Sequence, residues 1–103
     1  LGMWAPALRE VSLAATRLII DAYDRLGIAG TGLLLATPRE PSRRGSFVAF
    51  RRDDAKRVCA RLAERGVRTD VRGPLLRVGP APYLTSAEIL RGMEILAEVA
   101  RTP

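Results

Sequence analysis

The sequence predicts an α+β domain in which three helices pack on a small, mainly antiparallel sheet of three to four strands. Three stretches carry apolar residues at three- and four-residue steps, which is typical of amphipathic helices. Short runs rich in Val, Leu and Phe lie between them, bounded by glycine and proline, and are typical of strands. The resulting order of helix, strand, strand, helix, strand, strand, helix favours a two-layer sandwich.

The length of 103 residues indicates a single domain. We expect residues 1–27 to form a leading helix, and residues 28–103 to form the sheet and two further helices. No apolar run reaches the roughly 18 to 20 residues of a membrane span, and no leader peptide is visible. With one cysteine and hence no internal disulfide, we expect a cytoplasmic protein. The excess of arginine, sixteen against one lysine, suggests a bacterial source.

The missing residue types exclude several kinds of chemistry. The chain has no histidine, which removes histidine-based acid–base catalysis, Ser-His-Asp triads and most zinc sites. Lys56 lies among charged neighbours, so we expect a surface amine and not a Schiff base. Cys59 lies in an apolar helical stripe and is interpreted as a small buried hydrophobe. We therefore predict no catalytic residue, no cofactor-binding residue and no metal ligand within this chain.

The net charge of +6 raises the question of nucleic acid. The arginines are scattered along the chain, aromatic residues are only 5% of it, and no groove-reading motif occurs. A solvated, arginine-rich surface explains the charge more simply, so nucleic acid is the weakest of the hypotheses.

The first helix is predicted over residues 5–26. Pro6 suits its first turn, and Gly27 suits its end. We expect it to pack on the core through a stripe at helical spacing, made of Leu8, Val11, Ala15, Leu18, Ala22 and Leu26.

Two strands and a loop follow. Gly30-Thr31-Gly32 opens a predicted strand at residues 33–36; it lacks the third glycine and the helix of a dinucleotide fingerprint. Residues 37–45 are predicted to form a basic loop. The loop could bind an anion, but a solvated loop is the simpler interpretation. Residues 46–51 are predicted as a strand with Phe47 and Phe50 on opposite faces.

The second half repeats the pattern. A helix is predicted over residues 54–65, with Asp53 as its N-cap and Gly66 at its end. Residues 67–72 alternate as a strand, and Gly73-Pro74 turns the chain into residues 75–78 as an antiparallel neighbour. Thr85 and Glu88 form a capping-box pattern for a last helix that runs to about residue 100. Its predicted core face is Ile89, Met93, Leu96 and Val99 or Ala100.

Arg77 is the unusual residue of the last strand, because it lies between Leu76 and Val78. A buried cation is costly unless it is paired. Arg77 therefore either faces water on an open side of the sheet or binds an anion.

Four segments, in order along most of the chain, resemble one known family. They are Leu8-Arg9-Glu10-Val11-Ser12-Leu13 with Thr16 and Leu18; Thr37-Pro38-Arg39-Glu40-Pro41 with Arg44-Gly45-Ser46; Arg65-Gly66-Val67 with Asp70-Val71-Arg72-Gly73-Pro74; and Leu76-Arg77-Val78-Gly79-Pro80-Ala81-Pro82-Tyr83. The chain resembles the C-terminal small domain of kynureninase, a fold type I pyridoxal-phosphate (PLP) enzyme related to the class V aminotransferases.

The resemblance implies a function for a larger assembly. The family cleaves kynurenine hydrolytically to anthranilate and alanine in tryptophan catabolism, and its cofactor lysine belongs to the large domain. The arginine of its Arg-x-x-Pro segment binds the substrate α-carboxylate, which carries over to Arg77. Arg44, Ser46 and Tyr83 are secondary candidates; Tyr83 and Leu84 stand in swapped order relative to the usual Leu-Tyr.

Two main hypotheses follow. In the first, the chain is the small domain of a kynureninase-like PLP-dependent hydrolase, forming one wall of the site for a small amino-acid substrate. It is then inactive alone and needs PLP with a large domain or a split-gene partner; a homodimer is compatible with this. In the alternative, it is a stand-alone relic that binds a small carboxylate or a protein. A detached small domain should expose an apolar patch, for which Met3, Trp4 and one face of the first helix are candidates.

Overall fold

A computed structural model describes residues 4–40, 47–79 and 85–102, with side chains from residue 13 onward. The chain forms the predicted α+β domain with helices and an antiparallel sheet. Its elements in order are α1 (Trp4–Arg25), the 3-10 helix η1 (Ile28–Thr31), β1 (Leu34–Leu35), β2 (Val48–Arg51), α2 (Ala55–Glu64), β3 (Asp70–Arg72), β4 (Leu75–Val78) and α3 (Ser86–Arg101).

The four strands of the sheet are antiparallel and lie in the order β1-β2-β4-β3. Phe50 of β2 is opposite Leu76 of β4, which is opposite Val71 of β3. Side chains opposite each other across an antiparallel pair share one face of the sheet. Since Phe50 and Leu76 are completely buried, this face carries the core. We call it the inner face.

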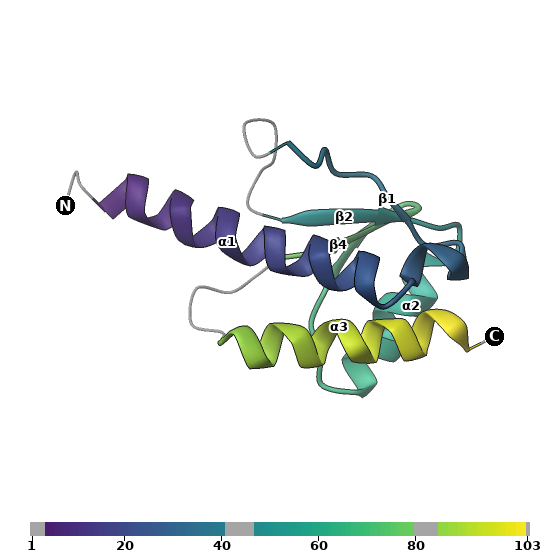
Figure 1. Ribbon diagram of the computed structural model, residues 1–103. Helices are drawn as coiled ribbons and strands as arrows, with labels where there is room; N and C mark the ends of the chain where they lie inside the picture. The colour runs from purple at the N-terminus through teal and green to yellow at the C-terminus, as the bar shows by residue number, and fades with distance from the viewer. Residues whose placement is uncertain (1–3, 41–46, 80–84, 103) are drawn as a thin grey trace.

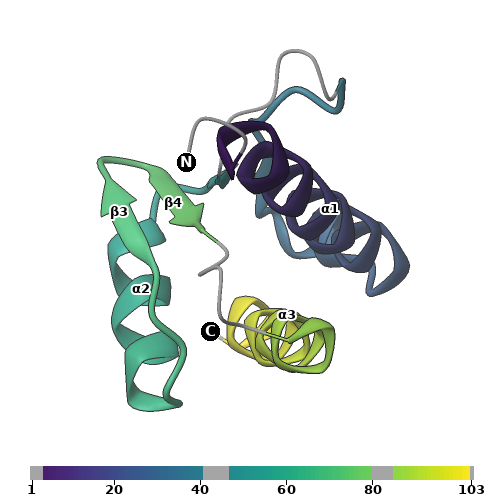
Figure 2. The ribbon, with the colours of Figure 1, turned by 90° about the vertical axis from the view of Figure 1, so that its left-hand side faces the viewer.

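The helices form the second layer, against the inner face. α1 and α3 lie side by side, and α2 runs along β3 and β4 (Figures 1 and 2). The core cluster joins the inner face to all three helices, for example Ile19 of α1, Val58 of α2 and Met93 of α3. Apolar burial of this kind is the main stabilising term, at roughly 25 cal/mol per Å².

The buried side of α1 differs from the predicted stripe. Ala22 is buried as expected, but Ala15, Leu18 and Leu26 are only half-buried, and Leu8 and Val11 lie outside the described side chains. The buried residues are instead Thr16, Ile19, Ile20, Ala22 and Tyr23. The reason is that α1 contacts both α3 and β2, so its core face is turned and broadened relative to a single stripe.

Tyr23 fixes this arrangement. Its ring stacks on Phe50 with 5.0 Å between centroids. Its hydroxyl donates to the carbonyl of Leu33 at 2.7 Å and accepts the N–H of Leu35 at 3.2 Å. Burial raises the pKa of Tyr23. A tyrosine buried in this way satisfies its polar end while it ties α1 to the start of β1.

The turns agree with the sequence in two places. Gly27 follows α1 with φ of 65°, and Gly73 has φ of 56° between β3 and β4. These angles favour glycine, because a Cβ strains the left-handed region. The capping box of α3 is confirmed: Thr85 Oγ1 accepts the N–H of Glu88 at 3.1 Å, and the Thr85 N–H donates to Glu88 at 3.0 Å.

The structure differs from the predicted elements at two boundaries and in one additional element. The N-cap position of α2 is Asp54 and not Asp53, and the Asp54 side chain makes no capping bond because two arginines bind it. β3 begins at Asp70 and is shorter than the predicted strand over residues 67–72, although its charged residues are exposed as expected. The 3-10 helix η1 was not predicted. Within the described ranges, no helix combines the length and apolarity needed to span a bilayer.

Candidate functional site

Arg77 lies on the face of the sheet opposite the helices, which we call the outer face. It is opposite Ala49 of β2 on one side and Asp70 of β3 on the other. Strand residues alternate between faces, so these three residues point away from Phe50 and Leu76. Leu34 and Phe47 are exposed by 55% and 39%, the exposed large apolar residues of the described chain. Phe47 is on this same face, because it contacts Arg77.

The Arg77 side chain has two partners among the described residues. Its Nη2 donates to Oδ2 of Asp70, and its Cζ lies 5.2 Å from the centroid of the Phe47 ring. The side chain is 27% exposed. A guanidinium carries five N–H donors, and the hydrogen bond to Asp70 uses one of those on Nη2. Nε and Nη1 of Arg77 have no acceptor within the described part of the chain. These donors can hold a planar anion such as a carboxylate through parallel charge-assisted bonds.

The charge of the outer face is positive. Arg51 and Arg72 lie across from Leu75, one row along the strands from Arg77, and both are exposed. Against these arginines the described strands place one carboxylate, Asp70, on this face. A surface with this excess of cations attracts anionic ligands and disfavours cationic ones.

Several arginines elsewhere form ion pairs within the chain. Arg39 of the basic loop binds both oxygens of Asp24, at 2.8 and 3.0 Å, and holds the pKa of that carboxyl below its usual value. Arg65 of α2's end binds Glu98 of α3 at 2.8 Å and likewise lowers the pKa of Glu98. These pairs link neighbouring elements at the surface, where solvent screens them and their contribution to stability is small.

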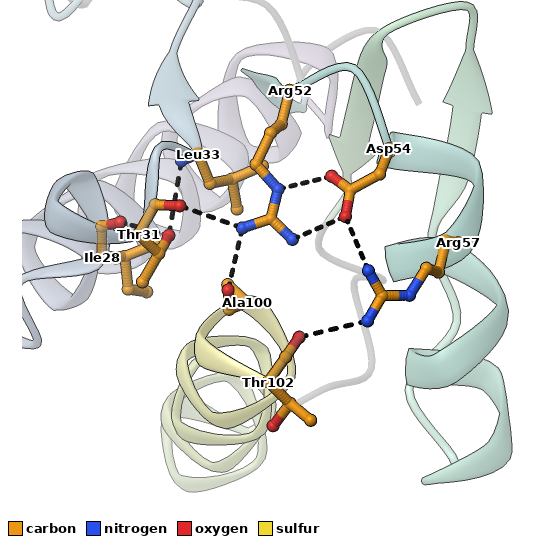
Figure 3. A network of polar contacts seen from close by, with 8 residues as sticks. All are labelled: Ile28, Thr31, Leu33, Arg52, Asp54, Arg57, Ala100 and Thr102. Atoms are coloured by element: carbon orange, nitrogen blue, oxygen red, sulfur yellow. Dashed lines mark hydrogen bonds and ion pairs between the residues drawn. The ribbon is translucent and has the colours of Figure 1, made fainter.

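A second arginine, Arg52, joins three elements at one end of the fold (Figure 3). Nε and Nη2 of Arg52 donate to the two oxygens of Asp54, at 2.5 and 3.0 Å. Nη1 donates to the carbonyl of Thr31 at 3.1 Å and to that of Ala100 at 2.8 Å. Arg52 is the main cause of the lowered pKa of Asp54. We call these residues the Arg52 node.

A hollow of about 640 Å³ opens between the end of α2, the segment 66–69 that follows it, the end of β4 and α3, and its wall includes Leu62, Val67 and Met93 but not Arg77. The described helices cover only the inner face of the sheet, so no described helix packs on the outer face.

The other residues singled out from the sequence lie elsewhere. Arg44, Ser46 and Tyr83 are outside the described residues. Lys56 is exposed on α2, as predicted. Cys59 is half-buried rather than fully buried, and its sulfur accepts the Thr69 hydroxyl at 3.3 Å.

The sequence reasoning missed the partners of Arg77. The signal was present for Asp70. A turn at Gly73-Pro74 places Arg72 opposite Leu75, and moving two residues away from the turn along each strand places Asp70 opposite Arg77. The contact with Phe47 had no such signal, because it depends on the register between β2 and β4.

Comparison with known proteins gives one consistent result. A family model described as "Kynureninase C-terminal domain" matches residues 8–96. A kynureninase of Pseudomonas fluorescens is 39% identical over 95 residues, which are 90% of this chain and 23% of that protein. A kynureninase of Koribacter versatilis is 35% identical over 99 residues, which cover 74% of this chain and 23% of that protein. A kynureninase of Geobacillus thermodenitrificans is 29% identical over 82 residues, which cover 79% of this chain and 19% of that protein. The chain thus spans about a quarter or less of these relatives.

Proposed function

Because this chain belongs to the kynureninase C-terminal domain family, we propose that it is the small domain of a PLP-dependent hydrolase that acts on kynurenine or a closely related amino acid. In this role Arg77 binds the substrate α-carboxylate, and the outer face forms one wall of the active site. The observation that carries the proposal is the state of Arg77: a guanidinium held by Asp70 and Phe47 on a sheet face that no described helix covers, with Nε and Nη1 free of acceptors among the described residues.

The chemistry of that guanidinium suits an amino-acid substrate. Two parallel N–H bonds to a carboxylate are charge-assisted and set the plane of the bound group as well as its position. A hydrogen bond to a charged group contributes about 1.5 to 3 kcal/mol. Because Arg77 rises from β4, between β2 and β3, its backbone is held on both sides. Such a rigid support keeps the carboxylate in a fixed place relative to the reacting bonds.

The residues described here do not fit a cofactor site. The one lysine of the sequence, Lys56, is exposed on α2, whereas an amine that forms a Schiff base needs desolvation or a neighbouring cation. No step of the reaction is therefore assigned to PLP within this chain. We propose that PLP and its lysine belong to a large domain, in the same polypeptide or in a partner chain.

The outer face is the surface on which we propose that this large domain docks. Exposed apolar residues mark surfaces that other proteins cover; on the outer face Phe47 contacts Arg77, and Leu34 lies opposite Arg51 on the edge strand β1. The patch expected at Met3 and Trp4 lies outside the described side chains. The short share of the relatives that this chain spans, 23% of the Pseudomonas fluorescens protein, is consistent with a missing larger part.

A chimeric enzyme tests the proposal. The matching C-terminal region of the Pseudomonas fluorescens kynureninase is replaced by this chain, and kynurenine hydrolysis is followed after PLP loading has been checked by absorbance. We expect hydrolysis, and a 10- to 100-fold lower kcat/KM for Arg77→Ala, which corresponds to about 1.4 to 2.8 kcal/mol. Arg91→Ala, on the exposed side of α3, is the matched control and should leave kcat/KM unchanged.

Two outcomes contradict the proposal. A folded, PLP-loaded chimera that does not act on kynurenine argues against the assigned substrate. A chimera in which Arg77→Ala and Arg91→Ala have the same kcat/KM shows that Arg77 does not bind the carboxylate.

A further inference from the structure

We infer that Asp70 is a positioning residue for Arg77: it holds one side of the guanidinium so that the remaining donors face the substrate carboxylate. The inference rests on the proposed function of Arg77. It assigns to this site a second charged residue, which acts on the substrate only through the arginine.

The register of the sheet places Asp70 for this role. It is directly opposite Arg77 across the β3–β4 pair, on the outer face, and Oδ2 accepts a hydrogen bond from Nη2. The tight turn at Gly73 fixes this register, because only two residues separate the end of β3 at Arg72 from the start of β4 at Leu75. The pair is therefore held by backbone geometry as well as by its own charges.

The Asp70 carboxylate is itself anchored. Its Oδ1 accepts the backbone N–H of Val71 at 2.8 Å, so each of its two oxygens has a donor. An anchored carboxylate restricts the arginine more than a freely rotating one does. Phe47 adds a third constraint, since its ring covers the guanidinium at 5.2 Å. Phe47 thus covers one face of the guanidinium and Asp70 binds Nη2, so that Nε and Nη1 remain available to bind a carboxylate.

Two opposing effects decide what Asp70 does to binding. As a second carboxylate it repels the substrate carboxylate, but its side chain is 58% exposed, and solvent limits the effect of such charges to a factor of about two. Ordering a long arginine side chain costs roughly a tenfold factor or more in affinity when it must occur during binding. Because part of that ordering is already done by Phe47 and by burial, we expect a net benefit from Asp70 of about 3- to 10-fold.

The test uses Asp70→Asn in the chimeric enzyme. Asparagine keeps the shape and an oxygen for the Val71 N–H, but it removes the charge that holds Arg77. We expect KM for kynurenine to rise 3- to 10-fold while kcat stays within twofold. A competitive inhibitor with a carboxylate should weaken by the same factor, whereas its neutral amide should be unaffected. Glu94→Gln, which removes the exposed Arg91–Glu94 pair of α3, is the control and should change neither constant.

A second measurement uses the 103-residue chain itself. With ¹⁵N-labelled arginine, restricted rotation about Nε–Cζ should give Arg77 separate Nη signals in the wild type. We expect Asp70→Asn to merge them, and Glu94→Gln to leave them separate.

The outcomes separate the two proposals. An unchanged or lower KM in Asp70→Asn, or Nη signals that do not respond to it, overturns the positioning role even where Arg77→Ala lowers kcat/KM as proposed. If Arg77→Ala itself has no effect, the proposed function of Arg77 fails first, and the positioning role fails with it.

Discussion

Arg52 and Arg77 show how one residue type serves two purposes in a small domain. Both side chains are mostly covered, with exposed fractions of 17% and 27%. All three nitrogens of Arg52 have acceptors: two in the Asp54 carboxylate, and the carbonyls of Thr31 and Ala100 for the third. Arg77 has one carboxylate partner and an aromatic ring, and its other two nitrogens have no acceptor in the described part of the chain.

The origin of the partners explains the difference. The acceptors of Arg52 come from the ends of η1 and α3 and from the start of α2, so its bonds join segments far apart in the sequence (Figure 3). A guanidinium at the C-terminal end of α3 is also favoured by the helix dipole. The partners of Arg77 are Asp70 of the neighbouring strand and Phe47 just before β2, so its contacts stay within the sheet. Saturation of the donors, more than burial, therefore separates an arginine that closes the fold from one suited to bind a ligand.

The largest effect on stability is expected for Arg52→Ala. The change removes the stronger of the two arginine partners of the Asp54 carboxylate and leaves the carbonyls of Thr31 and Ala100 without this donor, and such losses cost about 2 to 3 kcal/mol for partly buried groups. Urea denaturation should show a lower midpoint with an unchanged slope. The control is Arg57→Ala, because Arg57 also binds Asp54 but is exposed; it should cost less than about 1 kcal/mol. If both variants lose the same free energy of unfolding, the node does not join the elements as inferred.

The sequence predicted the elements of the fold better than their contacts. Local signals are sufficient for the capping box at Thr85, the turn at Gly73 and the alternation around Val71, because each depends on neighbours within a few residues. The buried side of α1 depends on which helices and strands surround it, which periodicity alone does not reveal. This is why Ile19 and Tyr23, outside the predicted stripe, are in the core.

The same limit applies to the candidate site. Arg77 stands out in the sequence because a charge between Leu76 and Val78 is unusual, and the family resemblance gives it a role. The Arg52 node has no comparable signal. Its acceptors include two backbone carbonyls, 21 and 48 residues away along the chain, and any residue type can supply a carbonyl. A site built from main-chain acceptors is visible only in the folded structure.

A smaller effect, which tests the node through pH, is expected for Asp54→Asn. Arg52 lowers the pKa of Asp54 in the folded chain below the value of about 3.9 in an unfolded one. This carboxylate therefore contributes stability that is present above about pH 4 and is lost as pH falls through the folded pKa. We expect the wild type to exceed Asp54→Asn by about 1 kcal/mol at pH 7, and the two to converge as pH falls through the lowered pKa of Asp54 in the folded chain. A difference that stays constant with pH would show that the charge of Asp54 is not the source of the stability.

The smallest effect is expected for the stability of Arg77→Ala, and it decides whether the two arginines truly differ. Its ion pair with Asp70 is exposed on the carboxylate side, and its contact with the Phe47 ring is worth about 0.5 to 1 kcal/mol. The alanine variant should therefore lose at most about 1 kcal/mol in urea denaturation, well below Arg52→Ala. Because the free donors of Arg77 contribute nothing to folding, most of its value should appear only when an anion is bound. A loss as large as that of Arg52→Ala would make Arg77 a structural residue, and its spare donors would then carry no functional meaning.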